Sequence, residues 1–217
     1  MAGGSAGTGV AGPESGCGMT CIVGIVEKKD GRVWIGGDSA GVAGYRLTAR
    51  ADEKVFRNGE FVIGFTSSFR MGQILRYCFT PPPIKTWDIW CYMVSEFIPA
   101  SMKAMRDHGW ERKAKDDGWA GGEIAGGTFL VGVRGQLFKV EGDFQVGIAR
   151  DGWAAVGCGD DLARGAIWAS SAAFEHVRLQ RALECAAALS AGVCAPFIML
   201  SDRGDELRWG EPKGEVA

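Results

Sequence analysis

The chain has 217 residues, 47% of them hydrophobic and 23% charged, a composition typical of one globular domain with a full core. Its net charge of −2 gives no excess of positive charge for binding nucleic acid. The sequence contains no run of about eighteen apolar residues, the length needed to span a membrane. With two histidines, and seven cysteines that form no C-x-x-C pair, we expect no metal site and reduced thiols, as in a cytoplasmic protein.

The beginning of the chain is predicted to be a leader. Residues 1–18 are mostly Gly, Ala and Ser, without Lys, Arg or a continuous apolar stretch, so they do not form a signal peptide. Met19 follows, and Thr20 then opens a β-like run. We predict that residues 1–19 are a flexible leader or propeptide that is removed, or that translation starts at Met19 and this Met is removed. Either route leaves residues 20–217 as one domain with Thr20 as its first residue; the alternative is that Thr20 merely begins a strand.

Two hairpins are predicted in the next part of the chain. Residues 20–40 carry apolar runs on either side of Asp30-Gly31, and residues 54–66 repeat this pattern about Asn58-Gly59. Asp-Gly and Asn-Gly between apolar runs are strong signals for tight turns. Two hairpins so close together indicate an antiparallel sheet.

Helical spacing of apolar residues then replaces the strand pattern. Residues 71–79 are predicted to form a helix, which the three prolines at 81–83 stop. A longer amphipathic helix is predicted over 86–108, with Thr86 as its N-cap. Pro99 falls in a widened gap between the apolar residues of this helix, and predicts a kink there or a split into two helices.

The second half of the chain repeats the order of strands followed by helices. Residues 109–126 are charged and Gly-rich and are predicted to form a loop. The elements predicted after this loop are a hairpin over 127–142, a strand segment over 144–159, helices over 160–171 and 175–191, and a strand pair over 195–210. Two antiparallel sheets packed together, with helices on both outer faces, use every element. The predicted fold class is therefore α+β, a four-layer αββα sandwich.

Thr20 is a candidate nucleophile. A Thr hydroxyl needs a base within hydrogen-bond reach, and a free α-amine on the same residue, with a pKa of about 7.7–8.0, can supply it. Asp38 ends the second apolar run, and Lys54 stands sixteen residues after it. An ammonium group lowers the pKa of a neighbouring hydroxyl or amine, and a carboxylate can hold the lysine in place. The alternatives are a turn-forming Asp38 and a solvated surface Lys54.

These residues resemble a known family, the proteasome β subunits and the bacterial HslV-type peptidase, which are N-terminal-nucleophile (Ntn) threonine hydrolases. The matching segments are TCIVGIV, GRVWIGGDSAGVAG, DEKVF and FVIGFTSS. Thr20, Asp38 and Lys54 fall on the Thr, Gly-Asp and Lys positions of the family. The later segment AAVGCGDDLARGA is similar to a Gly-Ser-Gly strand end that leads into a helix. The likeness covers most of residues 20–201 in element order and is specific in its first third.

Two positions depart from the family's pattern. Cys158 stands where the family usually has the Ser of Gly-Ser-Gly, which hydrogen-bonds the amine of the nucleophile; a thiol is a weaker donor, and a packed core thiol is the alternative. Ser67 takes the place of a Gly in the oxyanion turn, where its main-chain N–H can still serve. The Asp and Ser that many proteasome subunits carry near the last strands have no evident counterpart in AGVCAPFIML. Cys21 is a less favoured nucleophile, because it points to the opposite face of the strand from Thr20.

The resemblance implies a threonine peptidase that processes itself and hydrolyses peptide bonds through an acyl-enzyme. Its predicted catalytic residues are Thr20, Asp38, Lys54, Ser67 and Cys158. The resemblance also implies peptide or protein substrates, a homo-oligomeric ring, an ATP-dependent unfoldase as a candidate partner, and no metal or organic cofactor. Two alternatives stay open: a non-proteolytic amidohydrolase of the same fold, and a catalytically silent ring subunit. We further expect Lys54→Ala to abolish hydrolysis with little change in melting temperature.

Overall fold

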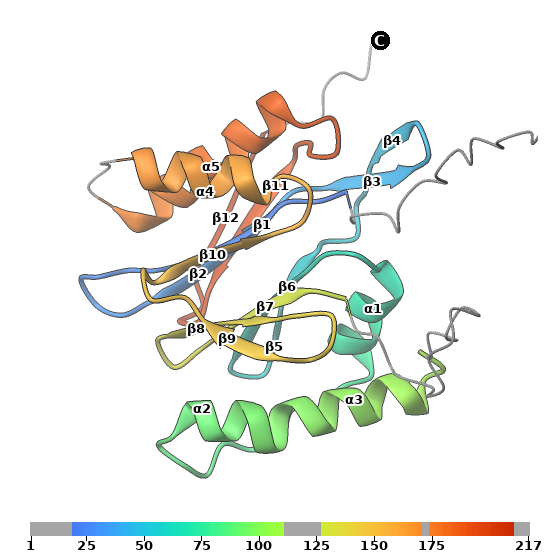
Figure 1. The fold of residues 1–217 in the computed structure, drawn as a ribbon, viewed down its shortest axis with the longest axis vertical. Helices are drawn as coiled ribbons and strands as arrows, with labels where there is room; N and C mark the ends of the chain where they lie inside the picture. The colour runs from blue at the N-terminus through green and yellow to red at the C-terminus, as the bar shows by residue number, and fades with distance from the viewer. Residues whose placement is uncertain (1–18, 111–126, 171–173, 211–217) are drawn as a thin grey trace, which may run out of the picture.

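Two five-stranded antiparallel sheets form the centre of the protein (Figure 1). The computed structural model describes residues 19–110, 127–170 and 174–210. The first sheet has the order β10-β1-β2-β11-β12, with β1 at Ile22–Val26, β2 at Val33–Gly37, β10 at Trp153–Val156, β11 at Phe197–Ser201 and β12 at Glu206–Trp209. The second has the order β5-β6-β7-β8-β9, with β5 at Val55–Asn58, β6 at Phe61–Phe65, β7 at Phe129–Val133, β8 at Gln136–Val140 and β9 at Val146–Ile148.

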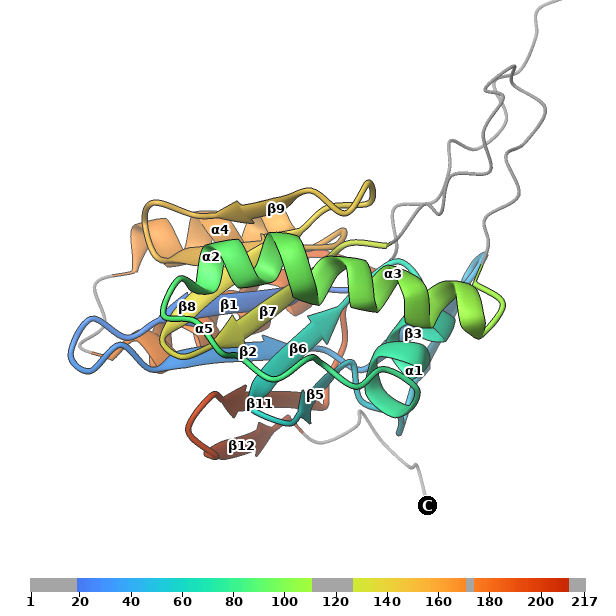
Figure 2. The same ribbon diagram turned by 90° about the horizontal axis from the view of Figure 1, so that it is seen from below.

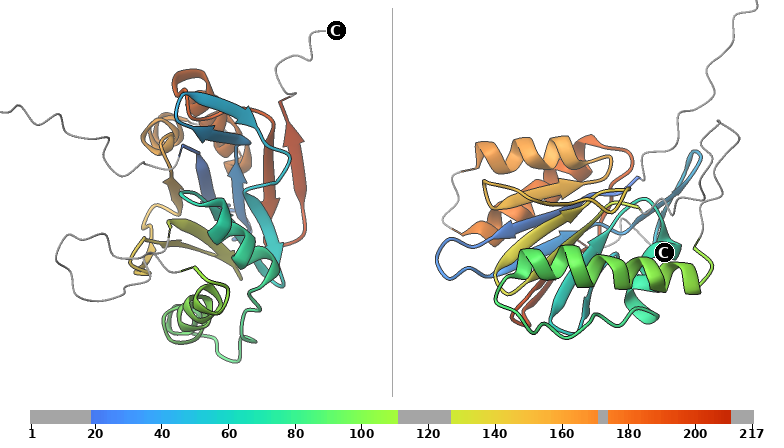
Figure 3. Two further views of the ribbon diagram at one scale, coloured as in Figure 1. Left: turned by 90° about the vertical axis from the view of Figure 1, so that its right-hand side faces the viewer. Right: turned by 60° about the horizontal axis from the view of Figure 1, so that its bottom comes forward.

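Helices cover both outer faces of the sheet pair (Figures 2 and 3). The first sheet is covered by α4 (Asp160–Ala169) and α5 (Glu175–Leu189), and the second by α1 (Phe69–Tyr77), α2 (Ile89–Tyr92), η1 (Met93–Phe97) and α3 (Ile98–Asp107). The predicted four-layer αββα sandwich is therefore confirmed. In the described part of the chain, no helix is long and apolar enough to cross a membrane.

Three apolar clusters hold the four layers together. One lies between the sheets and contains Ile22, Ile35 and Leu130, all fully buried. The other two fill the spaces between each sheet and its helices. Because both faces of each central strand are buried, these strands are almost wholly apolar, and only their ends are left to carry polar chemistry.

The predicted hairpin turns all form. Tight turns join β1 to β2, β5 to β6, β7 to β8 and β11 to β12. Each turn has a glycine with positive φ, a conformation that costs Gly little and other residues more; these are Gly31, Gly59, Gly135 and Gly204. The turn chemistry therefore fixes the strand register from the local sequence.

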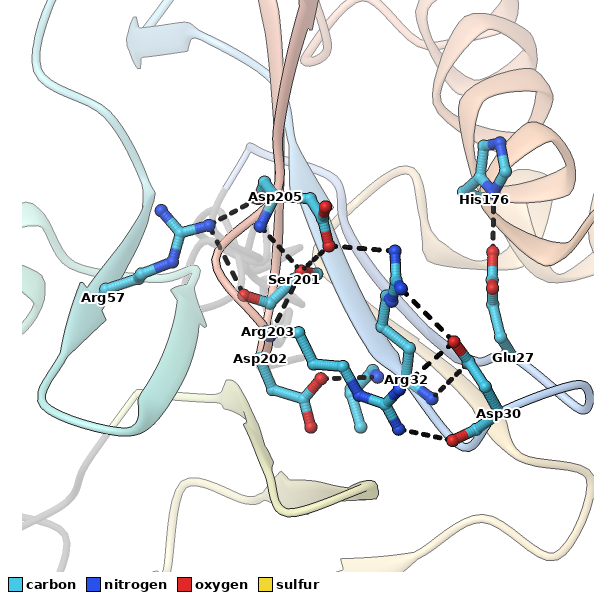
Figure 4. A network of polar contacts seen from close by, with 10 residues as sticks. Glu27, Asp30, Arg32, Arg57, His176, Ser201, Asp202, Arg203 and Asp205 are labelled. Atoms are coloured by element: carbon cyan, nitrogen blue, oxygen red, sulfur yellow. Dashed lines mark hydrogen bonds and ion pairs between the residues drawn. The ribbon is translucent and has the colours of Figure 1, made fainter.

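A polar network ties several of these turns together at one end of the sandwich (Figure 4). Asp202 accepts hydrogen bonds from the N–H of Val33 at 3.0 Å and of Gly135 at 2.9 Å, so it links the two sheets. Asp30 pairs with Arg203 at 3.2 Å. Thr20 lies at the other end of β1 from Asp30, so this network braces the end of the sandwich away from the predicted site.

The helix predicted over 86–108 differs from the structure in its start and in its middle. Its first helical residue is Ile89, and the Asp88 carboxylate is the cap, because it accepts the N–H of Cys91 at 2.9 Å; Thr86 lies too early and instead accepts the N–H of Asp88. The helix is not split at Pro99. The π-helical turn η1 ends at Phe97, two residues before Pro99. Its i→i+5 hydrogen bonding accommodates the N–H that proline lacks.

A short ribbon was not predicted. Strands β3 (Ala40–Ala43) and β4 (Arg46–Ala49) follow β2 in the chain and, among the described strands, pair only with each other. All of β4 is exposed, and the Gly-rich stretch around β3 is typical of a turn, so the ribbon was not predicted. Most of the predicted loop over 109–126, and the last residue of the predicted helix over 160–171, lie outside the described residues, as do residues 1–18 of the predicted leader.

Candidate active site

Thr20 lies just before β1 and is 4% exposed. Its Oγ1 accepts a hydrogen bond from Lys54 Nζ at 2.8 Å. The same hydroxyl donates to the carbonyl oxygen of Met19 at 2.6 Å. The candidate nucleophile is thus held by a cation on one side and, on the other, touches the peptide bond that precedes it.

Asp38 and Lys54 come from different sheets and meet at Thr20. Asp38 directly follows β2, whose last residue pairs with Ile22 of the neighbouring β1, and Lys54 directly precedes β5 of the second sheet. Lys54 Nζ donates to Asp38 Oδ1 at 2.9 Å, and both residues are 1% exposed. The three residues predicted from spacing are therefore brought together, and Lys54 is not a solvated surface charge.

Hydrogen bonds hold Asp38 on every side. Besides Lys54, its carboxylate accepts the N–H groups of Cys21 at 3.0 Å, Ala40 at 2.8 Å and Cys194 at 3.3 Å. Burial lowers the pKa of Lys54, and the neighbouring Asp38 carboxylate opposes this shift. A buried ion pair is tolerated when its remaining lone pairs are satisfied in this way, and the arrangement leaves Lys54 aimed at the Thr20 hydroxyl.

Ser67 lies in the turn between β6 and α1 and is exposed. Its φ of 75° is in the left-handed region, where Gly is favoured, and this gives a physical reason for a Gly in the resembling family. Ser68 caps α1 by accepting the N–H of Met71 at 3.4 Å. Among the described residues no acceptor takes the N–H of Ser67, which leaves that donor for an incoming carbonyl oxygen.

The segment Gly157-Cys158-Gly159 lies against Thr20, as the resemblance implied. The N–H of Gly159 donates to the carbonyl oxygen of Thr20 at 3.3 Å. The Cys158 thiol does not reach Thr20 itself. Its Sγ lies 3.6 Å from Ser190 Oγ, and it packs on Gly192, which in turn packs against Met19. Cys158 is therefore beside the residue that precedes the nucleophile.

Ser190 is a polar neighbour of the site that sequence reasoning missed. It is the C-cap of α5, and its hydroxyl also accepts the N–H of Gly192 at 3.3 Å. The segment searched for a family counterpart, AGVCAPFIML, begins one residue later. The sequence feature that could have pointed to Ser190 is its place near the end of the predicted helix, just before the last apolar run.

Cys21 has a structural place. It is fully buried, packs beneath the helices of the first sheet, and gives its N–H to Asp38. Burial raises the pKa of its thiol, with the Asp38 carboxylate adding to the shift. A thiol held protonated in this way is a poor nucleophile, which agrees with the preference for Thr20.

A cleft of about 520 Å³ opens beside these residues. One part of its lining is Thr66, Ser67, Gly157 and Cys158. Its other charged and polar lining residues come from the ends of β7 and β8 and the start of α4. Within the described ranges, no group of three or more His, Cys, Asp or Glu side chains is placed to hold a metal ion.

Solved structures with this fold include proteasome-like peptidases, although no protein-family model and no curated protein matches the sequence. BPH from Thiobacillus denitrificans superposes with a TM-score of 0.67 at 19% identity, over 84% of this chain and 97% of that chain. A second BPH structure, in complex with Epoxomicin, gives 0.61 at 20% over the same shares. Eukaryotic HslV from Trypanosoma brucei gives 0.57 at 17%, over 84% and 98%. A likeness at these identities shows the fold, so the chain has the αββα fold that BPH and HslV share.

Proposed function

We propose that this chain is an N-terminal-nucleophile hydrolase that cleaves peptide bonds with the hydroxyl of Thr20. The observation that carries the proposal is the position of Lys54, whose Nζ lies 2.8 Å from Thr20 Oγ1 and 2.9 Å from Asp38 Oδ1 in a buried setting. Burying a charged lysine costs free energy, and buried charges of this kind are typical of functional sites. Here the lysine is placed to raise the reactivity of the Thr20 hydroxyl. The shared fold with BPH and HslV supports the same chemistry.

The reaction needs only groups of this chain. Thr20 Oγ attacks the carbonyl carbon of a peptide bond while the free α-amine of Thr20 takes the hydroxyl proton. The Ser67 N–H and Lys54 stabilise the oxyanion, and the α-amine passes its proton to the leaving nitrogen as the C–N bond breaks. Water then attacks the ester, gives a proton to the α-amine, and releases the acid as Thr20 Oγ regains its proton.

The α-amine exists only if nothing precedes Thr20. In the full-length chain that nitrogen is part of the amide with Met19, and the Thr20 hydroxyl touches the carbonyl of that amide. We propose that Thr20 Oγ attacks the Met19 carbonyl carbon, and that the bond to the Thr20 nitrogen breaks as this nitrogen takes the proton. Water then hydrolyses the resulting ester and frees residues 1–19. A translation start at Met19, followed by removal of Met19, would give the same mature end.

Assembly into a homo-oligomeric ring is part of the proposal. In the outer helix layer Trp90 is 42% and Val94 48% exposed, and Trp87, just before α2, is 98% exposed, so a single copy presents large apolar side chains to water. Tyr92 lies on the same helical segment but is fully buried, and its hydroxyl donates to the Pro82 carbonyl oxygen. A monomer mass by light scattering at micromolar concentration would refute the ring. An ATP-dependent unfoldase stays a prediction from the resemblance, and a cytoplasmic location stays a prediction from the unpaired cysteines.

Three measurements on protein expressed from the full-length gene test the function. Intact mass and N-terminal sequencing should give a chain that begins at Thr20. Epoxomicin should add its mass to the peptide that contains Thr20, and hydrolysis of a peptide mixture should be lost in Thr20→Ala. Active protein that still carries residues 1–19 would refute the mechanism. A chain that begins at Thr20 but neither reacts nor hydrolyses would support the silent subunit instead.

A further inference from the structure

The main-chain N–H of Thr20, a buried residue, has no partner among the residues that the structure describes. The other polar groups of this residue are paired. Its hydroxyl contacts Lys54 and the Met19 carbonyl oxygen, and its own carbonyl oxygen accepts the N–H of Gly159. Because buried main-chain N–H groups are nearly always paired, an unpaired one on the proposed nucleophile calls for a functional explanation.

In the mature chain this nitrogen is the α-amine that serves the proposed reaction as its base. A neutral amine has two N–H groups and one lone pair, and the lone pair must point at the Thr20 hydroxyl to accept its proton. Acceptors that bind the N–H groups fix this direction. Since the same acceptors also bind the charged ammonium, they raise the pKa of the amine.

Cys158 and Ser190 border the place that Met19 leaves when it is removed. The Cys158 Sγ and the Met19 Cβ both lie against Gly192: a Cβ atom placed on this glycine would be 2.7 Å from the sulfur and 2.9 Å from Met19 Cβ. The Ser190 Oγ lies 3.6 Å from the Cys158 Sγ. Loss of the Met19 side chain leaves room for a water molecule, and the α-amine, the thiol and the hydroxyl are polar partners for it.

The backbone around Ser190 holds its hydroxyl in place. Ser190 is the C-cap of α5, where its N–H donates to the Ala186 carbonyl oxygen at 2.8 Å and its carbonyl oxygen accepts the N–H of Val193 at 3.4 Å. Its Oγ accepts the N–H of Gly192 at 3.3 Å, which leaves one lone pair and the O–H hydrogen for Cys158 and the vacated space. A hydroxyl is a stronger hydrogen-bond partner than a thiol, so Ser190 sets the orientation of the Cys158 S–H.

We infer that Ser190 is a positioning residue for the Thr20 α-amine, which it holds through the Cys158 thiol and the water that takes the place of Met19. This role rests on the proposed function, since the amine exists only in a chain that begins at Thr20. Ser190 supplies the strong hydrogen-bonding group that a thiol at position 158 does not. Its effect is on the direction and the basicity of the amine.

The pH dependence of hydrolysis tests this role. The acid limb of kcat/KM, measured with one peptide that wild-type protein cleaves, reports the protonation of the α-amine in the free enzyme. Ser190→Ala should lower kcat/KM about five-fold and move the acid limb about half a pH unit lower, because the ammonium loses an acceptor. Ser190→Thr should keep the wild-type rate and limb, since it keeps the hydroxyl and the extended backbone of this residue suits a β-branched side chain.

Ser170→Ala is the matched control, because Ser170 is likewise an extended C-cap, at the end of α4 that lies away from Cys158. It should leave kcat/KM and the acid limb unchanged. Ser190→Ala in a Cys158→Val protein should cause no further shift of the limb, because the thiol that transmits the effect is gone. A Ser190→Ala protein that melts earlier with an unmoved acid limb would give Ser190 a structural role only and overturn the inference, as would an equal shift in Ser170→Ala.

A direct titration of the amine separates this inference from the proposed function. The Thr20 α-amine is labelled with a trace of acetic anhydride between about pH 5 and 9, and the labelled peptide is quantified by mass spectrometry. The midpoint should be lower in Ser190→Ala than in wild type and in Ser190→Thr. A lowered midpoint in a chain that never hydrolyses would refute the peptidase function and leave the role of Ser190 standing. Hydrolysis with equal midpoints would refute the role alone, and a chain that keeps residues 1–19 would overturn both.

Discussion

Gly157 lies so close to Thr20 that a Cβ atom placed on it would be 2.1 Å from the Thr20 carbonyl oxygen. Its φ of 105° is also a conformation that L side chains rarely adopt. The first Gly of the Gly-Cys-Gly segment is therefore required by the backbone of the proposed nucleophile. The position of Thr20 depends on how this segment packs, as well as on β1.

Gly157→Ala should displace Thr20 and abolish hydrolysis, because the obstacle is a backbone atom that cannot rotate away. Stability should fall by at least about 1–2 kcal/mol from the backbone conformation alone. The matched control is Gly165→Ala in α4, where a Cβ would meet nothing within 4 Å. That change should raise stability by roughly 0.5–1 kcal/mol and leave the rate unchanged. Thermal melts and peptide hydrolysis are the measurements, and an active Gly157→Ala protein would contradict the packing argument.

Replacing Lys54 should lower kcat/KM by about 10² or more, since it removes the cation nearest the developing negative charge. Its burial changes the expected stability of the variant. Lys54→Ala leaves the Asp38 carboxylate buried without its cation, at a cost of about 3–5 kcal/mol, so the melting temperature should fall as well.

A double variant, Asp38→Asn with Lys54→Met, separates the catalytic role from the structural one. It removes both buried charges together, so it should recover most of the stability that Lys54→Ala loses and remain inactive. Lys54→Arg should also stay inactive, because the bulkier guanidinium cannot keep the 2.8 Å contact to Thr20 Oγ1 in this space. Hydrolysis by the double variant would show that Lys54 serves the fold alone.

Ser67→Gly should retain activity and keep or raise stability. The proposed oxyanion donor is the main-chain N–H, which the change preserves, and Gly removes the cost of a side chain at φ 75°. The gain is limited to about 1 kcal/mol, because Gly also adds entropy to the unfolded chain. Ser67→Val is the comparison, since a β-branched residue fits this conformation poorly and should lose both stability and rate. Melting curves and kcat/KM for both variants check this, and loss of activity in Ser67→Gly would assign a role to the hydroxyl.

The parts of the site that could be predicted from sequence are those set by single strands and turns. Thr20 and Asp38 stand at neighbouring ends of β1 and β2, whose register follows from the Asp-Gly turn, so their approach could be predicted from the local sequence. The place of Lys54, which comes from the other sheet, followed from the resemblance to the family. The fold followed from the same signals, because alternating strand and helix periods leave few ways to cover two sheets.

The parts that could not be predicted depend on contacts between distant elements. Ser190 meets Cys158 across thirty-two residues because the end of α5 reaches the start of α4, and no spacing rule encodes that approach. The charged cleft likewise needs β8 and α4 side by side, although they lie in different layers. The left-handed backbone conformation at Ser67 could be recognised only from the structure, because a Ser, unlike a Gly, does not indicate a positive φ.

Stability should decline above about pH 9 because of Cys21. Burial raises the pKa of this thiol above its ordinary value of 9.0, so the folded chain keeps a proton that the unfolded chain releases. The stabilisation is complete below pH 9.0 and falls by up to about 1.4 kcal/mol per pH unit above it. Urea unfolding between pH 8 and 10.5 should show a flatter slope for Cys21→Ala than for wild type. Cys78→Ala, which removes an exposed thiol, should keep the wild-type slope; equal slopes for all three proteins would contradict the prediction.

The Cys158 thiol and the Ser190 hydroxyl lie 3.6 Å apart beside Met19, so removal of the leader would leave this pair next to the new α-amine. A hydroxyl at position 158 is a stronger hydrogen-bond partner than a thiol, so Cys158→Ser should keep the rate or raise it up to about five-fold, the effect of one hydrogen bond of ~1 kcal/mol. Cys158→Val should lower the rate, because it removes the polar group at similar volume. Ser190 can pair with the new hydroxyl, so Cys158→Ser should also stay stable, and the rate becomes the informative measurement. Ser190→Ala in the Cys158→Ser background should cancel the gain if the two side chains act together on the amine. Equal kcat/KM for the Ser and Val variants would remove Cys158 from the site and leave it as a packed thiol at the start of α4.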